Sequence, residues 1–270
     1  MPISRIIHRK TFRNFSGEFE AIATRWSGMR LTKDRWTVLG KVTDLKKKAG
    51  SESQPDVAQC GPLQCVLKPG KKETDGKNRA AIEKIASDLG FELGLAVAPV
   101  ILWDRGNVPD DQERYACLIA WAFEPAFTWE ESEHGLGTAD RNKAARDVSA
   151  IWPFETWIAA TDRGGKHLLV SLPNADDVPQ TANIDYAFSM LYVWGNDPAH
   201  GSLAKPNWCA PVPPDQAAIM EIIDRIEKFQ ETTLRKIIDD IPEGFLQKSQ
   251  KEIIIVNLLN RQRKIRAIYS

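Results

Sequence analysis

The spacing of apolar residues predicts a chain that begins mainly with strands. Thr, Val, Trp and Ile are interleaved with polar residues over 5–12 and 35–42, which is typical of strands. A polar segment rich in Lys, Gly and Ser follows at residues 46–56 and is expected to be a loop. The apolar run at residues 64–69 then predicts another short strand.

A helix is expected next, from Arg79 onward. Apolar residues recur there in steps of three and four, which is the helical period, at Ile82, Ile85, Leu89 and Leu93. Asn78 is a suitable N-cap for this helix, and Gly94 is a suitable end. Two further strands are expected over residues 97–104 and 114–123.

Past Glu124 the chain becomes mainly helical. We expect, in order, a long helix, two short strands, a loop and a helical C-terminal region broken at Pro242 and Gly244, over residues 140–160, 168–172, 181–187, 195–214 and 216–270. This change of character predicts an α+β fold of two lobes. The first, residues 1–124, is rich in strands with one main helix, and the second, residues 125–270, is mostly helical.

Composition excludes some classes of function. The 270 residues are enough for one large domain or two modest lobes. Lys and Arg number 36, and Asp and Glu also number 36, so the zero net charge argues against nucleic-acid binding through bulk charge. No apolar run is long enough to span a membrane, and the N-terminus lacks the apolar core of a secretion signal, so we expect a cytoplasmic protein.

The cysteines and tryptophans have ordinary structural interpretations. The four cysteines form no C-x-x-C pair, so we expect reduced, mostly buried thiols rather than a zinc site or disulfides. Nine tryptophans are expected mostly to fill the core or to line grooves.

The candidate chemistry is carried by Lys68, Asp162 and Asp185. Lys68 stands in an apolar strand, and the two acids lie at the ends of apolar runs in the strings TDRGGKHLLV and ANIDYAFS. Phosphoryl transfer needs a lysine that holds phosphates, an acid that orients the nucleophile and an acid that holds Mg²⁺. These three residues therefore predict a site for a metal ion and a triphosphate.

Each of these residues also has a structural alternative. Lys68 could be a solvent-facing edge residue, and Glu83, taken alone, is typical of a solvated helix glutamate, although it could instead form an ion pair that aims Lys68. Asp162 could be an ordinary turn residue. Asp185 favours function most strongly, because a carboxylate among apolar neighbours is costly unless it is paired or binds a metal.

His167 lies between the two aspartates in the sequence. An asparagine here would offer Mg²⁺ an oxygen, whereas histidine offers a nitrogen, which Mg²⁺ does not favour. His167 is therefore expected to contact phosphate, to bind a softer ion such as Mn²⁺, or to do neither.

Together these segments resemble the protein-kinase-like superfamily, and within it the HipA-like kinases and the phosphatidylinositol 3-/4-kinase fold. In that group a strand lysine precedes a helix glutamate, and the helix runs into a leucine-glycine-leucine exit and a proline. Lys68, Glu83 and residues 93–99 (LGLAVAP) match this order. The resemblance covers residues 64–189.

The family's D-R-x-x-x-N loop and its I-D-F or I-D-H element are also matched. Asp162, Arg163 and His167 stand at the D, R and N positions, and Asp185 stands between Ile184 and Tyr186. The aromatic run before Asp162, WPFETWIAATD, is similar to that of the family.

The resemblance implies a bilobal kinase-like fold with ATP between the lobes. Lys68 would hold the α- and β-phosphates, Glu83 would hold Lys68, Asp162 would be the catalytic acid–base residue and Asp185 the principal ligand of Mg²⁺, with His167 beside it. The backbone of the predicted hinge would bind adenine at Trp121, Ala122 and Phe123. A HipA-like kinase transfers phosphate to a protein Ser or Thr hydroxyl, and self-phosphorylation is expected.

Three departures from the family pattern keep other interpretations open. No G-x-G-x-x-G loop precedes Lys68, His167 replaces the asparagine, and Tyr186 and Ala187 replace the Phe-Gly pair. The main alternative is a pseudokinase-like module that binds a nucleotide or a partner without catalysis. The third is a structural α+β protein whose acidic residues are incidental.

Overall fold

The computed structural model describes residues 43–47, 56–60, 63–68, 70, 79–104, 114–120, 127–132, 138–160, 163–170, 181–190 and 214–270. The strands expected over 5–12 and 35–42, the N-cap at Asn78 and the lobe boundary near Glu124 lie outside these residues. They stay predictions, as does the division into two lobes.

Five antiparallel strands form the first sheet, in the order β1-β2-β3-β5-β4. They are β1 (Thr43–Lys47), β2 (Asp56–Cys60), β3 (Leu63–Lys68), β4 (Val100–Asp104) and β5 (Tyr115–Ala120). The apolar runs predicted β3, β4 and β5, but the expected polar loop is wrong at both ends. Lys47 ends β1 and pairs with Asp56 of β2, so the pairing of backbone groups outweighs the low strand propensity of these residues.

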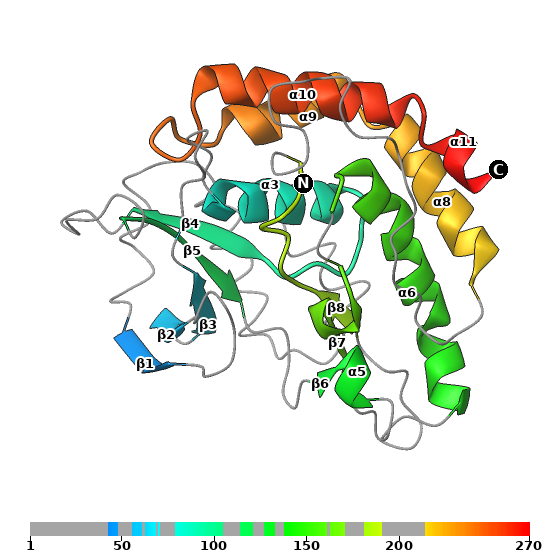
Figure 1. Ribbon diagram of the computed structural model, residues 1–270, viewed down its shortest axis with the longest axis horizontal. Helices are drawn as coiled ribbons and strands as arrows, with labels where there is room; N and C mark the ends of the chain where they lie inside the picture. Colours follow the sequence, from blue (N-terminus) through cyan, green and yellow to red (C-terminus); the bar gives the residue numbers. More distant parts are fainter. Residues whose placement is uncertain are drawn as a thin grey trace.

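The helix α3 (Arg79–Glu92) begins at the residue where the sequence predicts it. It contacts β4 and β5, and Ile82, Ile85 and Leu89 are fully or almost fully buried, as their spacing predicts. The other sides of the helix are covered as well, because every residue from 80 to 91 is buried. The C-terminal helix α9 (Glu231–Asp239) contacts α3 and lies above it in Figure 1.

Gly94 ends α3 as expected. It adopts φ 72°, in the left-handed region that glycine tolerates best. The Gly94 N–H donates to the Phe91 carbonyl, and the Leu95 N–H donates to the Gly90 carbonyl, both at 2.9 Å. These two bonds satisfy carbonyls that the helix end would otherwise leave without a partner.

A smaller antiparallel sheet has the order β6-β7-β8. Its strands are β6 (Phe127–Thr128), β7 (Leu168–Val170) and β8 (Thr181–Asn183), and the short helices α5 (Trp129–Ser132) and η2 (Gly165–His167) adjoin it. Asn183 of β8 also pairs with the segment after α3: its N–H donates to the Ala96 carbonyl at 2.7 Å, and its carbonyl accepts the Ala98 N–H at 3.1 Å. This bridge fixes β8 next to the segment that follows α3, two residues before Asp185.

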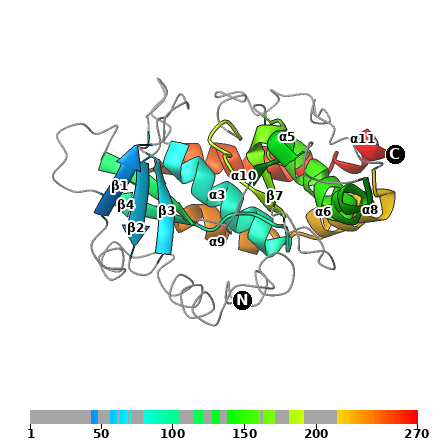
Figure 2. The same ribbon diagram turned by 90° about the horizontal axis from the view of Figure 1, so that it is seen from below.

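The remaining helices are α6 (Thr138–Trp157), α8 (Gln216–Glu227), α9, α10 (Lys248–Gln262) and α11 (Arg266–Tyr269). α6 and α8 pack side by side, as Figure 2 shows. The break predicted at Pro242 and Gly244 is confirmed, since it separates α9 from α10. A second break at residues 228–230 was not expected; Phe229 lies there and packs against Trp157, with ring centroids 5.5 Å apart.

One hydrophobic core joins the first sheet and α3 to the long helices. Trp157 lies fully buried in it and donates its indole N–H to the Leu258 carbonyl at 2.9 Å, which agrees with the expected role of the tryptophans. Cys117 is a free, buried thiol. Among the described residues, none of the helices has the length and apolar character needed to cross a membrane.

Candidate active site

Lys68 ends β3 and points inward. Its side chain is 14% exposed, so it is not a solvent-facing edge residue. The ammonium Nζ lies 2.9 Å from Glu83 Oε1 and 2.7 Å from Asp185 Oδ1. Burial alone would lower the pKa of Lys68, but the two carboxylates outweigh burial and hold this pKa above its usual value. The ammonium therefore stays charged.

Glu83 on α3 is buried, which corrects the interpretation as a solvated helix residue. Only 2% of its side chain is exposed. Oε1 accepts a hydrogen bond from Lys68, and Oε2 accepts the backbone N–H of Tyr186 at 2.8 Å. Burial raises the pKa of Glu83, while Lys68 and the Tyr186 N–H favour the carboxylate. α3 thus connects the end of β3 to the backbone beside Asp185.

Asp185 follows β8 in a left-handed backbone conformation, with φ 65°. This region is uncommon for a residue with a side chain, so the surrounding structure must hold it. The carboxylate is 34% exposed and contacts Lys68. Burial would raise the pKa of Asp185, but Lys68 outweighs burial and lowers the pKa to about 2. Asp185 is therefore ionised at neutral pH.

His167 lies close to Asp185. It belongs to η2 and is 6% exposed, and its backbone carbonyl accepts the Ile184 N–H at 3.0 Å. His167 adds to the effect of Lys68 in lowering the pKa of Asp185. Across the described part of the chain, no three or more His, Cys, Asp or Glu side chains gather as a metal site would require. Metal binding by Asp185 and His167 stays a prediction.

The structure thus brings together Lys68, Glu83 and Asp185, which are far apart in the sequence. The proposed catalytic residue Asp162 lies outside the described residues, as do the proposed adenine contacts Trp121, Ala122 and Phe123. Their roles stay predictions.

Two buried charged residues beside the site, Arg163 and Glu155, were not predicted to have a role, apart from the place of Arg163 in the D-R pair. The Arg163 side chain is 3% exposed and that of Glu155 is fully buried. Nε of Arg163 donates to Glu155 Oε1 at 2.7 Å, and Nη1 donates to the carbonyls of Ile184 and Asp185 at 2.8 and 2.7 Å. In the sequence, the feature that could have identified them is an acidic and a basic residue eight positions apart, on either side of the end of α6.

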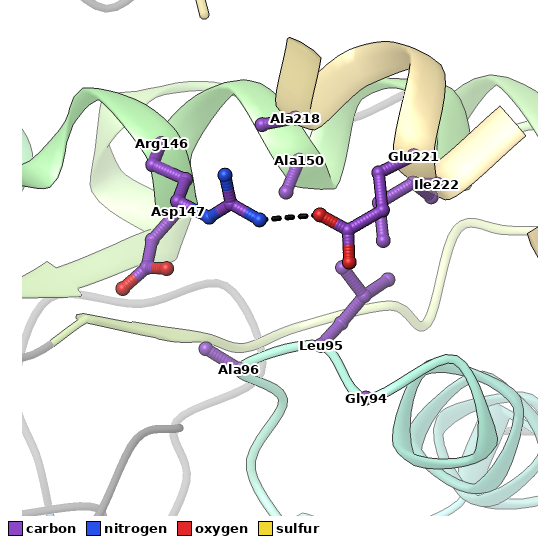
Figure 3. A pocket seen from close by; sticks show the side chains of 9 residues that line it. All are labelled: Gly94, Leu95, Ala96, Arg146, Asp147, Ala150, Ala218, Glu221 and Ile222. Atoms are coloured by element: carbon purple, nitrogen blue, oxygen red, sulfur yellow. Dashed lines mark hydrogen bonds and ion pairs between the residues drawn. The ribbon is translucent and has the colours of Figure 1, made fainter. Parts of the chain in front are cut away.

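A separate small pocket lies between residues 94–96, α6 and α8 (Figure 3). Its lining includes Arg146 and Glu221, which form an ion pair between α6 and α8. Glu221 also pairs with Arg225, which donates to the Leu93 carbonyl at 2.7 Å. These contacts fasten α6 and α8 to the end of α3, and none of the paired site residues lines the pocket.

The sheet order, the helix between β3 and β4, and the ion-paired lysine agree with the kinase-like fold that the sequence resemblance implies. The crystal structure of the Helicobacter pylori proinflammatory kinase CtkA is similar to this chain, with a TM-score of 0.58 and 16% sequence identity. The similarity covers 85% of this chain and 94% of CtkA. At this identity it shows a shared fold, which confirms the predicted class of fold without its division into lobes.

The other comparisons support no further conclusion about the fold or the family of the chain. The structure of WaaP in complex with acyl carrier protein matches over 96% of both chains with 14% identity, but its TM-score of 0.37 is too low to support an argument. No model of a known protein family matches the chain, and no curated protein sequence matches it. The HipA-like branch that the sequence resembles therefore stays a proposal.

Proposed function

We propose that the chain is an ATP-dependent phosphotransferase, a kinase that resembles the HipA-like Ser/Thr kinases. The observation that carries this proposal is the position of Lys68, within 2.9 Å of Glu83 and 2.7 Å of Asp185, in a chain with the fold of a kinase. A buried lysine with two carboxylates has the charge and the fixed position needed to bind phosphate oxygens.

Lys68 would bind the phosphates of ATP, and Glu83 would position it. Glu83 holds both the lysine and the Tyr186 N–H, so it sets the distance between β3 and the segment that carries Asp185. The raised pKa of Lys68 keeps the positive charge that phosphate binding requires.

The residues present fit a hard divalent cation. Asp185 offers an ionised, one-third exposed carboxylate, and Mg²⁺ is usually held by one or two carboxylates together with substrate phosphates. Asp185 would hold the ion, with His167 beside it, and Mn²⁺ suits the histidine nitrogen better than Mg²⁺ does. When bound, the ion would neutralise phosphate charge.

Asp162 would orient the acceptor hydroxyl and accept its proton, and the backbone at Trp121, Ala122 and Phe123 would bind adenine. We propose a protein Ser or Thr hydroxyl as the acceptor, including one on the chain itself. These assignments follow the resemblance to HipA-like kinases.

A nucleotide-binding module without catalysis is the second candidate. The observation that favours it is His167, which occupies the position of the family's second metal ligand and lies near Asp185. Such a module would keep the contacts of Lys68 but would transfer no phosphate.

Nucleotide binding can be tested by thermal shift with ATP and either Mg²⁺ or Mn²⁺. A ligand that binds the folded state raises the melting temperature, so we expect stabilisation of the wild type and its loss in Lys68→Met. Lys248→Met, an exposed lysine on α10, is the matched control and should keep the shift. A wild type that neither metal–nucleotide pair stabilises would rule out both the kinase and the nucleotide-binding module.

Catalysis is tested by incubation with labelled ATP. We expect wild-type protein to incorporate label and Asp162→Ala to lose this activity. Equal incorporation by the two proteins would contradict the role of Asp162. Binding without any incorporation, with a range of protein acceptors, would favour the module without catalysis.

A further inference from the structure

Arg163 and Glu155 form an unusually costly ion pair inside the protein. Both side chains are almost fully buried, and both lie next to the apolar core. Within the described residues, Nη2 of Arg163 has no hydrogen-bond acceptor. Burying two charges costs solvation free energy, and their attraction does not offset this cost unless every donor is satisfied. A protein with apolar residues of similar volume in their place is often at least as stable. Stability of the core is therefore a weak explanation for this pair.

What the pair does contact is the backbone on both sides of Asp185. Nη1 of Arg163 donates to the Ile184 carbonyl at 2.8 Å and to the Asp185 carbonyl at 2.7 Å. The guanidinium carbon lies 4.3 Å from the centroid of the Tyr186 ring. Glu155 on α6 accepts from Nε, so it fixes the direction in which the guanidinium points.

The peptide group between Asp185 and Tyr186 is thus held at both ends. Its carbonyl accepts from Arg163 at 2.7 Å, and its N–H donates to Glu83 at 2.8 Å. Because a peptide group is planar, hydrogen bonds to both its carbonyl and its N–H hold it in a single orientation. Arg163 also holds the preceding peptide group through the Ile184 carbonyl, so the two peptide groups together fix the left-handed conformation of Asp185, with φ 65°, which is uncommon for a residue with a side chain.

We infer that Arg163, oriented by Glu155, is a positioning residue that holds Asp185 with its carboxylate aimed at Lys68 and at a metal-bound phosphate. The part of this inference that concerns the metal rests on the proposed function. The part that concerns the backbone of Asp185 does not. A lysine at position 163 cannot replace the arginine, because one ammonium lacks the planar fork that reaches Glu155 and two carbonyls together.

Arg261 provides a matched control. It is also a buried arginine, 7% exposed, and it donates to two backbone carbonyls, those of Trp157 at 2.9 Å and Thr156 at 2.6 Å. These carbonyls lie at the end of α6 rather than beside Asp185. Arg261→Lys therefore removes a comparable set of bonds without touching the peptide groups around Asp185.

The first measurement is the affinity for Mn²⁺ in the presence of a non-hydrolysable ATP analogue. Free Mn²⁺ is detected by its electron paramagnetic resonance signal. Loss of a residue that orients a metal ligand weakens metal affinity about 10- to 100-fold. We expect this loss in Arg163→Lys and a change of less than about twofold in Arg261→Lys, on the same scale. Equal losses in both variants would overturn the inference, as would an unchanged affinity in Arg163→Lys.

The second measurement, amide hydrogen exchange, needs no nucleotide and separates the two proposals. In Arg163→Lys the Tyr186 N–H should exchange faster relative to the core amides of α3, and in Arg261→Lys it should not. If the wild type binds no metal–nucleotide but this exchange pattern holds, the proposed function fails and the positioning of Asp185 stands. An unchanged Tyr186 N–H in a folded Arg163→Lys protein overturns the positioning itself.

A second variant covers the case in which Arg163→Lys does not fold. Glu155→Gln keeps the shape of the side chain and one acceptor oxygen, so Arg163 remains buried but is held less firmly. We expect the same two effects in smaller size. A Glu155→Gln protein with wild-type Mn²⁺ affinity and wild-type exchange at Tyr186 overturns the role of Glu155.

Discussion

Replacing Lys68 with methionine removes one charge from a buried ion pair and keeps most of the volume of the side chain. Glu83, which is 2% exposed, would lose its cationic partner at 2.9 Å. Removing one partner of such a pair costs about 3–5 kcal/mol, because the other charge is left buried. Asp185 adds at most about 1 kcal/mol, since partly exposed pairs contribute little.

We therefore expect the free energy of unfolding to fall by about 3 kcal/mol at pH 7, which for a chain of this size lowers the melting temperature by about 6–12 °C. The loss depends on pH, because a proton can neutralise Glu83. Without Lys68, the pKa of Glu83 rises further above its ordinary value of 4.5. A carboxyl group with a raised pKa in the folded state destabilises the fold as the pH rises through that pKa. The difference from wild type should thus be larger at about pH 8 than at about pH 5.

The assay is urea denaturation monitored by tryptophan fluorescence at both pH values. It compares the wild type, Lys68→Met, Glu83→Gln and the double variant. Lys248→Met is the control and should unfold with the wild type. The double variant should be more stable than Lys68→Met, because no unpaired charge remains buried. A loss below about 0.5 kcal/mol in Lys68→Met, or one that does not vary with pH, would refute the buried pair.

Three further changes give separate tests. The Tyr186 hydroxyl is buried with no hydrogen-bond partner in the described part of the chain, so Tyr186→Phe should be neutral or stabilising by up to about 1 kcal/mol in urea denaturation, and a clear loss would reveal a partner. His167→Asn should raise Mg²⁺-supported incorporation of label, because an oxygen replaces a nitrogen near Asp185; an equal or lower rate would give His167 a role of its own. Gly94→Ala should lose about 1–2 kcal/mol in the same denaturation assay, because φ is 72°, and unchanged stability would contradict this conformation.

Local patterns predicted the part of the fold that carries the site. The order of β3, α3, β4 and β5 follows from two periodicities in the sequence, and Gly94 follows from the chemistry of helix ends. Lys68 and Asp185 were identifiable because a charged residue in an apolar run needs a partner or a ligand.

What local patterns did not predict depends on packing between distant segments. The family resemblance, not a local pattern, assigned Glu83 to Lys68. Locally, Glu83 looks like an exposed helix glutamate, because its burial is produced by elements on both sides of α3. The paired strands β1 and β2 contain charged residues that alone favour a loop. The contact of Arg163 with the backbone at Asp185 joins residues 22 positions apart, and no residue pattern records it.

The burial of α3 ties the site to the C-terminal helices. α9 contacts α3 directly, and Phe245, in the connection between α9 and α10, packs edge-on against Tyr115 of β5 with centroids 4.9 Å apart. Moving α3 away from Lys68 would separate α9 from it and would expose the buried Lys84–Asp88 pair on the same helix, 2.8 Å apart. Both changes would expose apolar or charged groups that are now buried. The distance between Lys68 and Glu83 is therefore set by the packing of helices more than 140 residues further along the chain.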